Sequence, residues 1–213
     1  MNIPEVFANP DWRVYLIADA GMLPRKSLLK RVGLALAAGV GALQLRAKDL
    51  PVREALELGF ELRALARARG IPFLVDDRLD LALALAADGL HIGQEDLPAS
   101  LVRGLFKGIL GVSVASPEQA QAALAAGADY LGVGAVFPSS SKPGAEVIGL
   151  AGLRAVVAVT PLPCVAIGGI SAGVIAALKQ AGARGAAVIA SVLQSPDPAA
   201  ATRELLLAWE GNE

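Results

Sequence analysis

Short apolar runs alternate along the chain with longer segments in which apolar residues recur at helical spacing. The short runs predict strands near 13–19, 42–47, 72–77, 89–94, 109–114, 130–136, 163–168 and 185–190. The longer segments predict helices near 27–39, 51–69, 79–87, 98–106, 116–126, 149–158, 172–181 and 198–209. Ala-Gly pairs, such as Ala38-Gly39 and Ala126-Gly127, end several of these helices, since glycine tolerates the left-handed conformation there.

Strand–helix units of about 25 residues repeat without a composition break or a long linker, which favours one (βα)8 TIM barrel domain over residues 1–213. An open doubly wound sheet is the alternative. That fold typically begins with a G-x-G-x-x-G turn, whereas the first strand here runs into Ala18-Asp19-Ala20-Gly21. In a barrel the chemistry is carried by the loops that follow the strands, so functional residues are expected there.

The charge balance argues against a polyanionic partner. Lys and Arg number 19 against 20 Asp and Glu, without a basic cluster, so no nucleic acid is expected to bind. No apolar stretch approaches the ~18 residues that span a bilayer, and the first residues lack the pattern of a signal peptide. The lone Cys164 fits a reducing compartment, and we expect a cytoplasmic protein without a membrane partner. A homo-oligomer is compatible with the sequence.

The second strand ends in polar residues that share one face. Gln44, Arg46 and Lys48 alternate with Leu43 and Leu45, so the polar set is expected to point into the barrel mouth. A buried arginine is costly unless an anion meets it, which points to a phosphate or diphosphate ligand. The alternative is a structural ion pair with a carboxylate on a neighbouring strand.

Carboxylates end the third and fourth strands. Asp76-Asp77 and Asp96 are expected at adjacent strand ends, and Asp77 with Asp96 is the pair best placed for a magnesium ion. Magnesium is usually held by one or two protein carboxylates, with water and substrate phosphate at its other positions. The alternative is that Asp76 or Asp96 caps the following helix.

The remaining candidates follow strands five to eight. Ser113 is expected to turn its hydroxyl into the mouth, and the segment 137–144 is either a phosphate-closing loop or an ordinary solvated one. Backbone amides after the last two strands, beginning at Gly168-Gly169, suit a phosphate cradle. His91, the only histidine, is expected to be a packed neutral side chain, and Cys164 a buried one.

The motifs together resemble the thiamine phosphate synthase family, whose barrel is shared with thiazole tautomerases. The resemblance rests on Gln44-Leu45-Arg46-Ala47-Lys48, Val75-Asp76-Asp77-Arg78, Gly93-Gln94-Glu95-Asp96, Gly111-Val112-Ser113, Gly132-Val133-Gly134 and Ile167-Gly168-Gly169-Ile170. It covers nearly the whole chain. It implies a transferase that joins a hydroxymethylpyrimidine diphosphate to a thiazole phosphate, releasing pyrophosphate and thiamine phosphate.

The same resemblance implies the role of each site residue. Gln44, Arg46 and Lys48 would hold the pyrimidine diphosphate, with Asp76 beside it. Lys142 would reach the leaving group, and Ser113 would lie near the pyrimidine, so Arg46, Lys48, Ser113 and Lys142 form the expected catalytic set. Asp77 and Asp96 would bind Mg²⁺. The thiazole phosphate would meet Ser139, Ser140, Ser141, Gly169, Ile189 and Ala190.

The chain departs from the family pattern at three places. Asp76 stands where the family usually has asparagine, and an ionised carboxylate there would repel a diphosphate. Ala115 stands where relatives commonly carry a histidine that the tautomerases use for proton transfer. Serines replace the usual threonines after the sixth strand, and Lys142-Pro143-Gly144 is more similar to the tautomerase branch. A thiazole tautomerase and a non-catalytic precursor-binding barrel therefore remain as alternatives.

Overall fold

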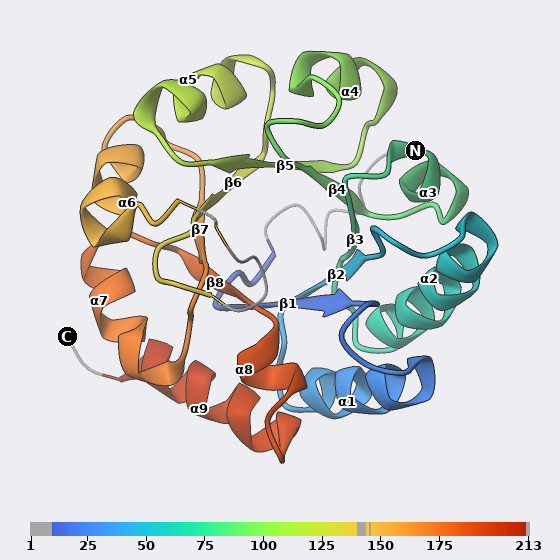
Figure 1. The fold of residues 1–213 in the computed structure, drawn as a ribbon. Helices are drawn as coiled ribbons and strands as arrows, with labels where there is room; N and C mark the ends of the chain where they lie inside the picture. The colour runs from blue at the N-terminus through green and yellow to red at the C-terminus, as the bar shows by residue number, and fades with distance from the viewer. Residues whose placement is uncertain (1–9, 140–143, 145, 212–213) are drawn as a thin grey trace.

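Parallel strands close into a barrel in sequence order, and β8 returns to pair with β1 (Figure 1). The computed structural model describes residues 10–139, 144 and 146–211. The strands are β1 (Val14–Asp19), β2 (Ala42–Arg46), β3 (Phe73–Asp76), β4 (Gly89–Ile92), β5 (Ile109–Val114), β6 (Tyr130–Gly134), β7 (Cys164–Ile167) and β8 (Gly185–Val188). The predicted (βα)8 barrel is therefore confirmed, and the pairing of Val14 with Ala186 excludes the open sheet.

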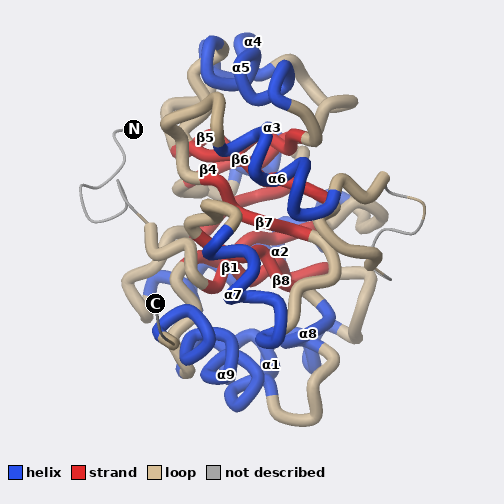
Figure 2. Tube along the Cα trace, turned by 90° about the vertical axis from the view of Figure 1, so that its left-hand side faces the viewer, coloured by secondary structure: helices blue, strands red, loops and turns tan. Residues whose placement is uncertain are grey.

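Helices surround the barrel on its outside. They are α1 (Arg25–Ala37), α2 (Val52–Arg67), α3 (Leu79–Ala84), α4 (Ala99–Leu105), α5 (Pro117–Ala125), α6 (Gly149–Val157), α7 (Ile175–Gln180), α8 (Ala190–Leu193) and α9 (Pro198–Glu210), with a 3₁₀ turn η2 (Ala172–Val174) before α7. Figure 2 shows the strands running between these helices, with α4 and α5 at one side and α1 and α9 at the opposite side.

The strand expected over 185–190 and the helix expected over 172–181 have other bounds in the structure. The strand expected over 185–190 stops at Val188, and Ile189 (φ −126°, ψ −85°) turns the chain into the short helix α8. The helix expected over 172–181 begins as the 3₁₀ turn η2 and becomes α-helical only at Ile175. Both differences lie in the segments that follow β7 and β8, on the side of the barrel mouth.

Side chains of β2 point alternately toward two apolar clusters, one between the strands and the helices and one inside the barrel. Leu43 and Leu45 are fully buried between the strands and the helices. Gln44 and Arg46 point inward, as the alternation predicted. A second cluster fills the inside of the barrel below them, made of Trp12, Tyr15, Ile17, Ala42, Leu74, Ile109, Tyr130, Val165 and Ala187. This inner cluster forms the bottom of the cavity that the residues at the barrel mouth line.

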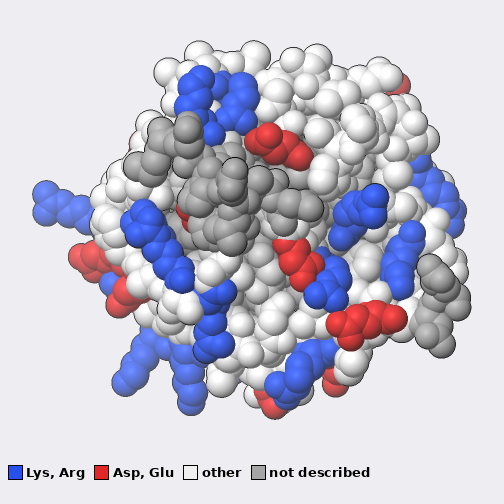
Figure 3. Space-filling model, turned by 180° about the vertical axis from the view of Figure 1, so that it is seen from behind, with Lys and Arg blue, Asp and Glu red and all other residues white. Residues whose placement is uncertain are grey.

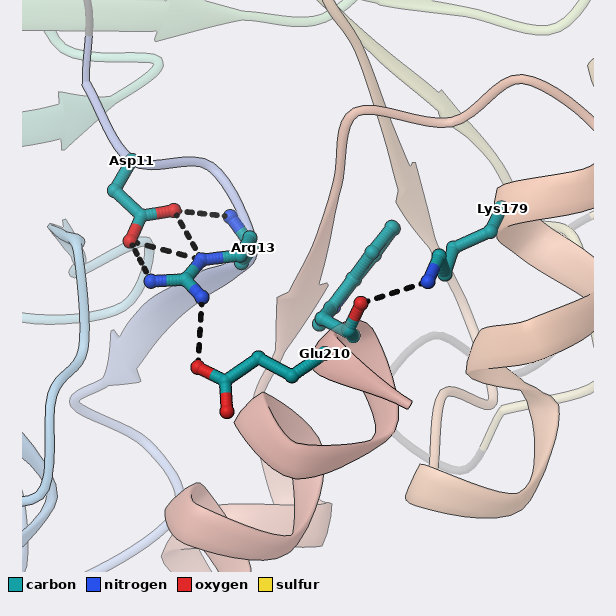
Figure 4. Close-up of polar contacts among 5 residues, drawn as sticks. Asp11, Arg13, Lys179 and Glu210 are labelled. Carbon is teal, nitrogen blue, oxygen red and sulfur yellow. Dashed lines mark hydrogen bonds and ion pairs between the residues drawn. The ribbon is translucent and has the colours of Figure 1, made fainter. Parts of the chain in front are cut away.

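The last helix is tied to the segment before β1 by one exposed ion pair and to α7 by a hydrogen bond (Figure 4). Arg13 binds Asp11 at 2.8 Å and Glu210 at 3.1 Å, and Lys179 Nζ donates to the carbonyl oxygen of Trp209 at 2.8 Å. Such exposed pairs contribute about 0–1 kcal/mol each, so packing of α9 carries most of the attachment.

The surface mixes both signs of charge. Basic and acidic side chains are interspersed on the face drawn in Figure 3, in keeping with the net charge of −1. Among the described residues, no helix is long and apolar enough to cross a bilayer.

Candidate active site

A cavity of about 680 Å³ opens at the ends of the strands. Every described residue that the sequence singled out for the site lines it, namely Gln44, Arg46, Lys48, Asp76, Asp77, Asp96, Ser113, Ser139, Gly169, Ile189 and Ala190. The other three candidates, Ser140, Ser141 and Lys142, lie outside the described residues. The size of the cavity suits a small molecule rather than a polymer.

The cations on the β2 side are paired with carboxylates of neighbouring strands. Arg46 Nη1 lies 2.6 Å from Asp19 Oδ2, and Arg46 Nε lies 3.5 Å from Asp76 Oδ2. Lys48 Nζ lies 2.9 Å from Asp77 Oδ2. The structural ion pairs that were the alternative explanation for Arg46 are thus present. Because the Lys48 side chain is 48% exposed, it is held at the rim and remains accessible to a ligand.

The acidic pair Asp77 and Asp96 is held in place by the backbone of β4. Asp77 has a φ of 61°, in the left-handed region that aspartate tolerates better than most residues, and its N–H donates to the His91 carbonyl oxygen at 2.8 Å. Asp96 Oδ2 accepts the Gly93 N–H at 2.7 Å. Burial raises the pKa of Asp77 and the neighbouring Asp96 raises it further, while Lys48 opposes both. Two mutually repelling carboxyl groups of this kind favour a shared cation.

Asp76 lies deeper than Asp77. Burial raises the pKa of Asp76 to about 7, and the charge of Asp77 adds to the effect, whereas Arg46 and Lys48 oppose it. The carboxyl group is therefore easily protonated near neutrality, which lessens its repulsion of an anion.

The alternative role of Asp76 or Asp96, as the cap of the following helix, is not observed. The N-terminal flanking residue of α3 is Arg78 and that of α4 is Pro98, and neither helix has a side-chain hydrogen bond at this end. The carboxylates of Asp76 and Asp96 face the cavity instead.

A chain of hydrogen bonds crosses the floor of the cavity. Gln44 Nε2 donates to Tyr15 Oη at 2.7 Å, and Tyr15 Oη lies 3.0 Å from Tyr130 Oη. Tyr130 Oη lies 2.8 Å from His91 Nδ1, and His91 Nε2 lies 2.8 Å from Ser113 Oγ. Burial lowers the pKa of His91 to about 4, so the imidazole is neutral at physiological pH.

The glycine pair after β7 makes room for another segment of the chain. Gly169 has a φ of 62°, and a Cβ atom there would lie 2.5 Å from the Pro138 carbonyl oxygen and 2.7 Å from Phe137 Cβ. The pair is thus required by close packing of the segment after β6. Ala190, which begins α8, lines the same cavity, and the first N–H groups of a helix have no acceptor within the helix.

Comparison with known proteins decides the family. The chain matches the thiamine monophosphate synthase family over residues 14–192. The chain belongs to that family. A thiamine-phosphate synthase of Moorella thermoacetica is 48% identical over 199 residues, covering 92% of this chain and 95% of the relative. One of Roseiflexus castenholzii is 48% identical over 211 residues, covering 95% and 92%.

Solved structures agree with this assignment. A thiamine phosphate pyrophosphorylase from Pyrococcus furiosus is 41% identical, with a TM-score of 0.87 over 94% of this chain and 96% of that one. A 3-hexulose-6-phosphate synthase with a TM-score of 0.71 is only 21% identical and shares the fold alone. The resemblance drawn from the sequence motifs to an enzyme family of thiamine biosynthesis is confirmed.

Sequence reasoning missed several polar residues inside the barrel of this member of the thiamine monophosphate synthase family. Asp19 was not recognised as a partner of Arg46, and Tyr15 and Tyr130 were read only as parts of strands. The alternation of side chains along β1 and β6 could have placed both tyrosines inside the barrel. A buried hydroxyl there needs a hydrogen-bond partner. His91 was expected to be buried and neutral, as it is, but its contact with Ser113 was not expected.

Proposed function

We propose that the chain is a magnesium-dependent thiamine phosphate synthase that joins 4-amino-2-methyl-5-hydroxymethylpyrimidine diphosphate to thiazole phosphate, as one barrel domain over 1–213. The observation that carries the proposal is the meeting of Lys48 with Asp77 and of Arg46 with Asp76 at one rim. A tautomerase acting on a thiazole carboxylate phosphate has no diphosphate to neutralise, so it has less need of this combination.

The residues present fit Mg²⁺. Burial raises the pKa of Asp77 and the neighbouring carboxylate of Asp96 raises it further, and a cation between the two would relieve that repulsion. When bound, magnesium would neutralise part of the diphosphate charge. Two protein carboxylates leave room for phosphate oxygens and water around this metal.

Arg46 and Lys48 would bind the diphosphate and stabilise it as it leaves. The bond between the pyrimidine methylene carbon and the diphosphate oxygen breaks, and both electrons depart with pyrophosphate. The resulting pyrimidinylmethyl cation is captured by the lone pair of the thiazole nitrogen, giving thiamine phosphate. This substitution needs charge stabilisation and alignment more than a general base, so a neutral His91 is no obstacle.

The other substrate would lie on the opposite side of the cavity. We assign its phosphate to Ser139, Gly169 and the amides of Ile189 and Ala190, which line the cavity in the segments after β6, β7 and β8. Residues 140–142 complete this expected set but lie outside the described part of the chain. Gln44 and Ser113 would meet the pyrimidine on the cavity floor.

Incubation of the purified chain with both substrates and Mg²⁺ tests the proposal. We expect equal amounts of thiamine phosphate and pyrophosphate, and neither product when one substrate is omitted. Alteration of the thiazole compound alone would favour a tautomerase. Binding of both compounds without turnover would favour a non-catalytic barrel.

A matched pair of lysine variants sharpens this test. Lys48→Gln removes the rim cation and should lower kcat/KM at least about a hundredfold, as loss of an electrostatic stabiliser typically does. Lys107→Gln, at an exposed position just before β5, changes the net charge equally and should leave kcat/KM within about twofold. Equal effects of the two substitutions would contradict the assignment of Lys48.

A further inference from the structure

We propose that Tyr15, Tyr130 and His91 are positioning residues whose hydrogen bonds run in one sense, from Gln44 to Ser113. The chain would thereby fix Gln44 as a hydrogen-bond acceptor and Ser113 as a donor toward the substrate. All five residues line the same cavity, and they come from β1, β2, β4, β5 and β6. Only the consequence of this hydrogen-bond chain for catalysis rests on the proposed function.

The orientation of Gln44 sets the sense of the chain. Its Nε2 donates to Tyr15 Oη, so the single proton of Tyr15 is available for Tyr130. With the Gln44 amide in this orientation, the opposite sense would bring donors from both sides onto Tyr15. Its own proton would then be buried without an acceptor among the described residues, which is the costlier arrangement.

The same sense continues through the imidazole. Tyr130 donates its proton to His91 Nδ1, so the one proton of a neutral imidazole lies on Nε2. Nε2–H then donates to Ser113 Oγ, which leaves the serine proton free to point into the cavity.

Packing holds the rings of the chain in place. The Trp12 and Tyr130 ring centroids lie 4.2 Å apart, and those of Trp12 and Tyr15 lie 5.4 Å apart. A Cβ atom at Gly111 would overlap the Tyr130 ring, and one at Gly132 would lie 2.8 Å from His91 Cε1. Both glycines therefore provide the space that the two rings occupy.

The two ends of the chain present complementary groups. Gln44 Oε1 has no hydrogen-bond partner among the described residues and remains an acceptor, while Ser113 offers its proton. A heteroaromatic ring that carries an amino group and a ring nitrogen matches this pair, since it offers one N–H and one lone pair. A reversed chain would make Ser113 an acceptor and would lose the match.

The position of the proton on His91 tests the inference without any substrate. Because His91 is the only histidine of the chain, ¹⁵N-histidine labelling gives one set of ring signals. We expect a pyrrole-type Nε2 and a pyridine-type Nδ1 in the wild-type protein at neutral pH. Protonation of Nδ1 instead would overturn the inference, whatever the enzyme activity proves to be.

Two tyrosine variants provide a matched comparison. Tyr130→Phe removes the donor to Nδ1, so we expect the Nε2–H tautomer to lose its dominance. Tyr15→Phe removes a buried hydroxyl of the same kind but leaves His91 Nδ1 as the one acceptor, among the described residues, for the Tyr130 proton, so the wild-type tautomer should persist. An unchanged tautomer in Tyr130→Phe would overturn the inference.

A kinetic cycle tests the consequence for catalysis. Tyr130→Phe should lower kcat about tenfold, whereas adding it to Ser113→Ala should lower kcat less than about twofold further, because Tyr130 acts through Ser113. Fully multiplicative losses would contradict action through Ser113. If the wild-type chain makes no thiamine phosphate, the proposed function fails, while the tautomer still decides the positioning chain.

Discussion

Lys48 Nζ, from the loop after β2, lies 2.9 Å from Asp77 Oδ2 at the end of β3. With Lys48 48% and Asp77 16% exposed, an ion pair of this kind contributes about 0–1 kcal/mol to folding. Asp77 also has a left-handed φ of 61°, which costs some backbone energy in a residue other than glycine. The arrangement contributes little to stability and instead places a cation beside a carboxylate, where we propose that a metal-bound diphosphate lies.

Loss of either member of the acidic pair should remove turnover when magnesium is scarce. We expect Asp77→Ala and Asp96→Ala each to lower the rate at least about a hundredfold at low Mg²⁺, with partial recovery as Mg²⁺ is raised. Asp80→Ala is the control, since Asp80 is exposed and pairs with Arg78 outside the cavity. Full activity of both site variants would contradict the metal assignment.

Asp76 should make the fold less stable as pH rises. Its folded pKa of about 7 lies above the unfolded value of 3.8, so the folded chain retains a proton that the unfolded chain releases. Stability from this group is fully present below about pH 4, falls between about pH 4 and 7, and is absent above.

Asp76→Asn tests that dependence, because asparagine has the same shape and no proton to lose. We expect the variant to match the wild type near pH 4 and to be more stable at pH 8, by at most about 4 kcal/mol. Chemical denaturation at both pH values measures the difference. A variant less stable than wild type at pH 8 would show that the ion pair with Arg46 outweighs desolvation.

His91 should stay neutral through the physiological range. Its lowered pKa, about 4, means that the unfolded chain takes up a proton first as the pH falls below about 6.5, so stability declines toward about pH 4. An NMR titration of the single histidine should show a midpoint near pH 4. A midpoint near 6.5 would mean that the ring is not buried as described.

Gly111 should not tolerate a side chain. A methyl group there would overlap the Tyr130 ring, so Gly111→Ala should lower the free energy of unfolding by about 1–3 kcal/mol. Gly104→Ala is the control, since Gly104 lies in α4 with no atom near its Cβ position. That substitution should stabilise the chain by about 0.5–1 kcal/mol. Equal effects in thermal unfolding would contradict the packing argument.

The barrel and its inward-facing polar residues could be predicted because both depend on local periodicity. The alternation at Gln44 and Arg46 on β2 fixed which side chains enter the barrel, and the parallel strands brought Asp77 and Asp96 to the same rim. Charge and position together were enough to predict which side chains line this part of the cavity.

The remaining features depend on contacts between distant segments. Helix α8 is only four residues long, too short for a helical period to appear in the sequence. The bond between Tyr15 and Tyr130 joins strands 115 residues apart, and the requirement for Gly169 comes from the approach of Pro138. None of these contacts leaves a local pattern, so only the folded chain shows them.

Binding of pyrophosphate, measured by titration calorimetry with and without Mg²⁺, tests the central claim most directly. The wild-type chain should bind pyrophosphate far more tightly with Mg²⁺. Asp77→Asn should lose that enhancement, and Asp80→Asn should retain it. Pyrophosphate binding that is the same with and without Mg²⁺, or unchanged in Asp77→Asn, would contradict a metal-bridged diphosphate at this rim.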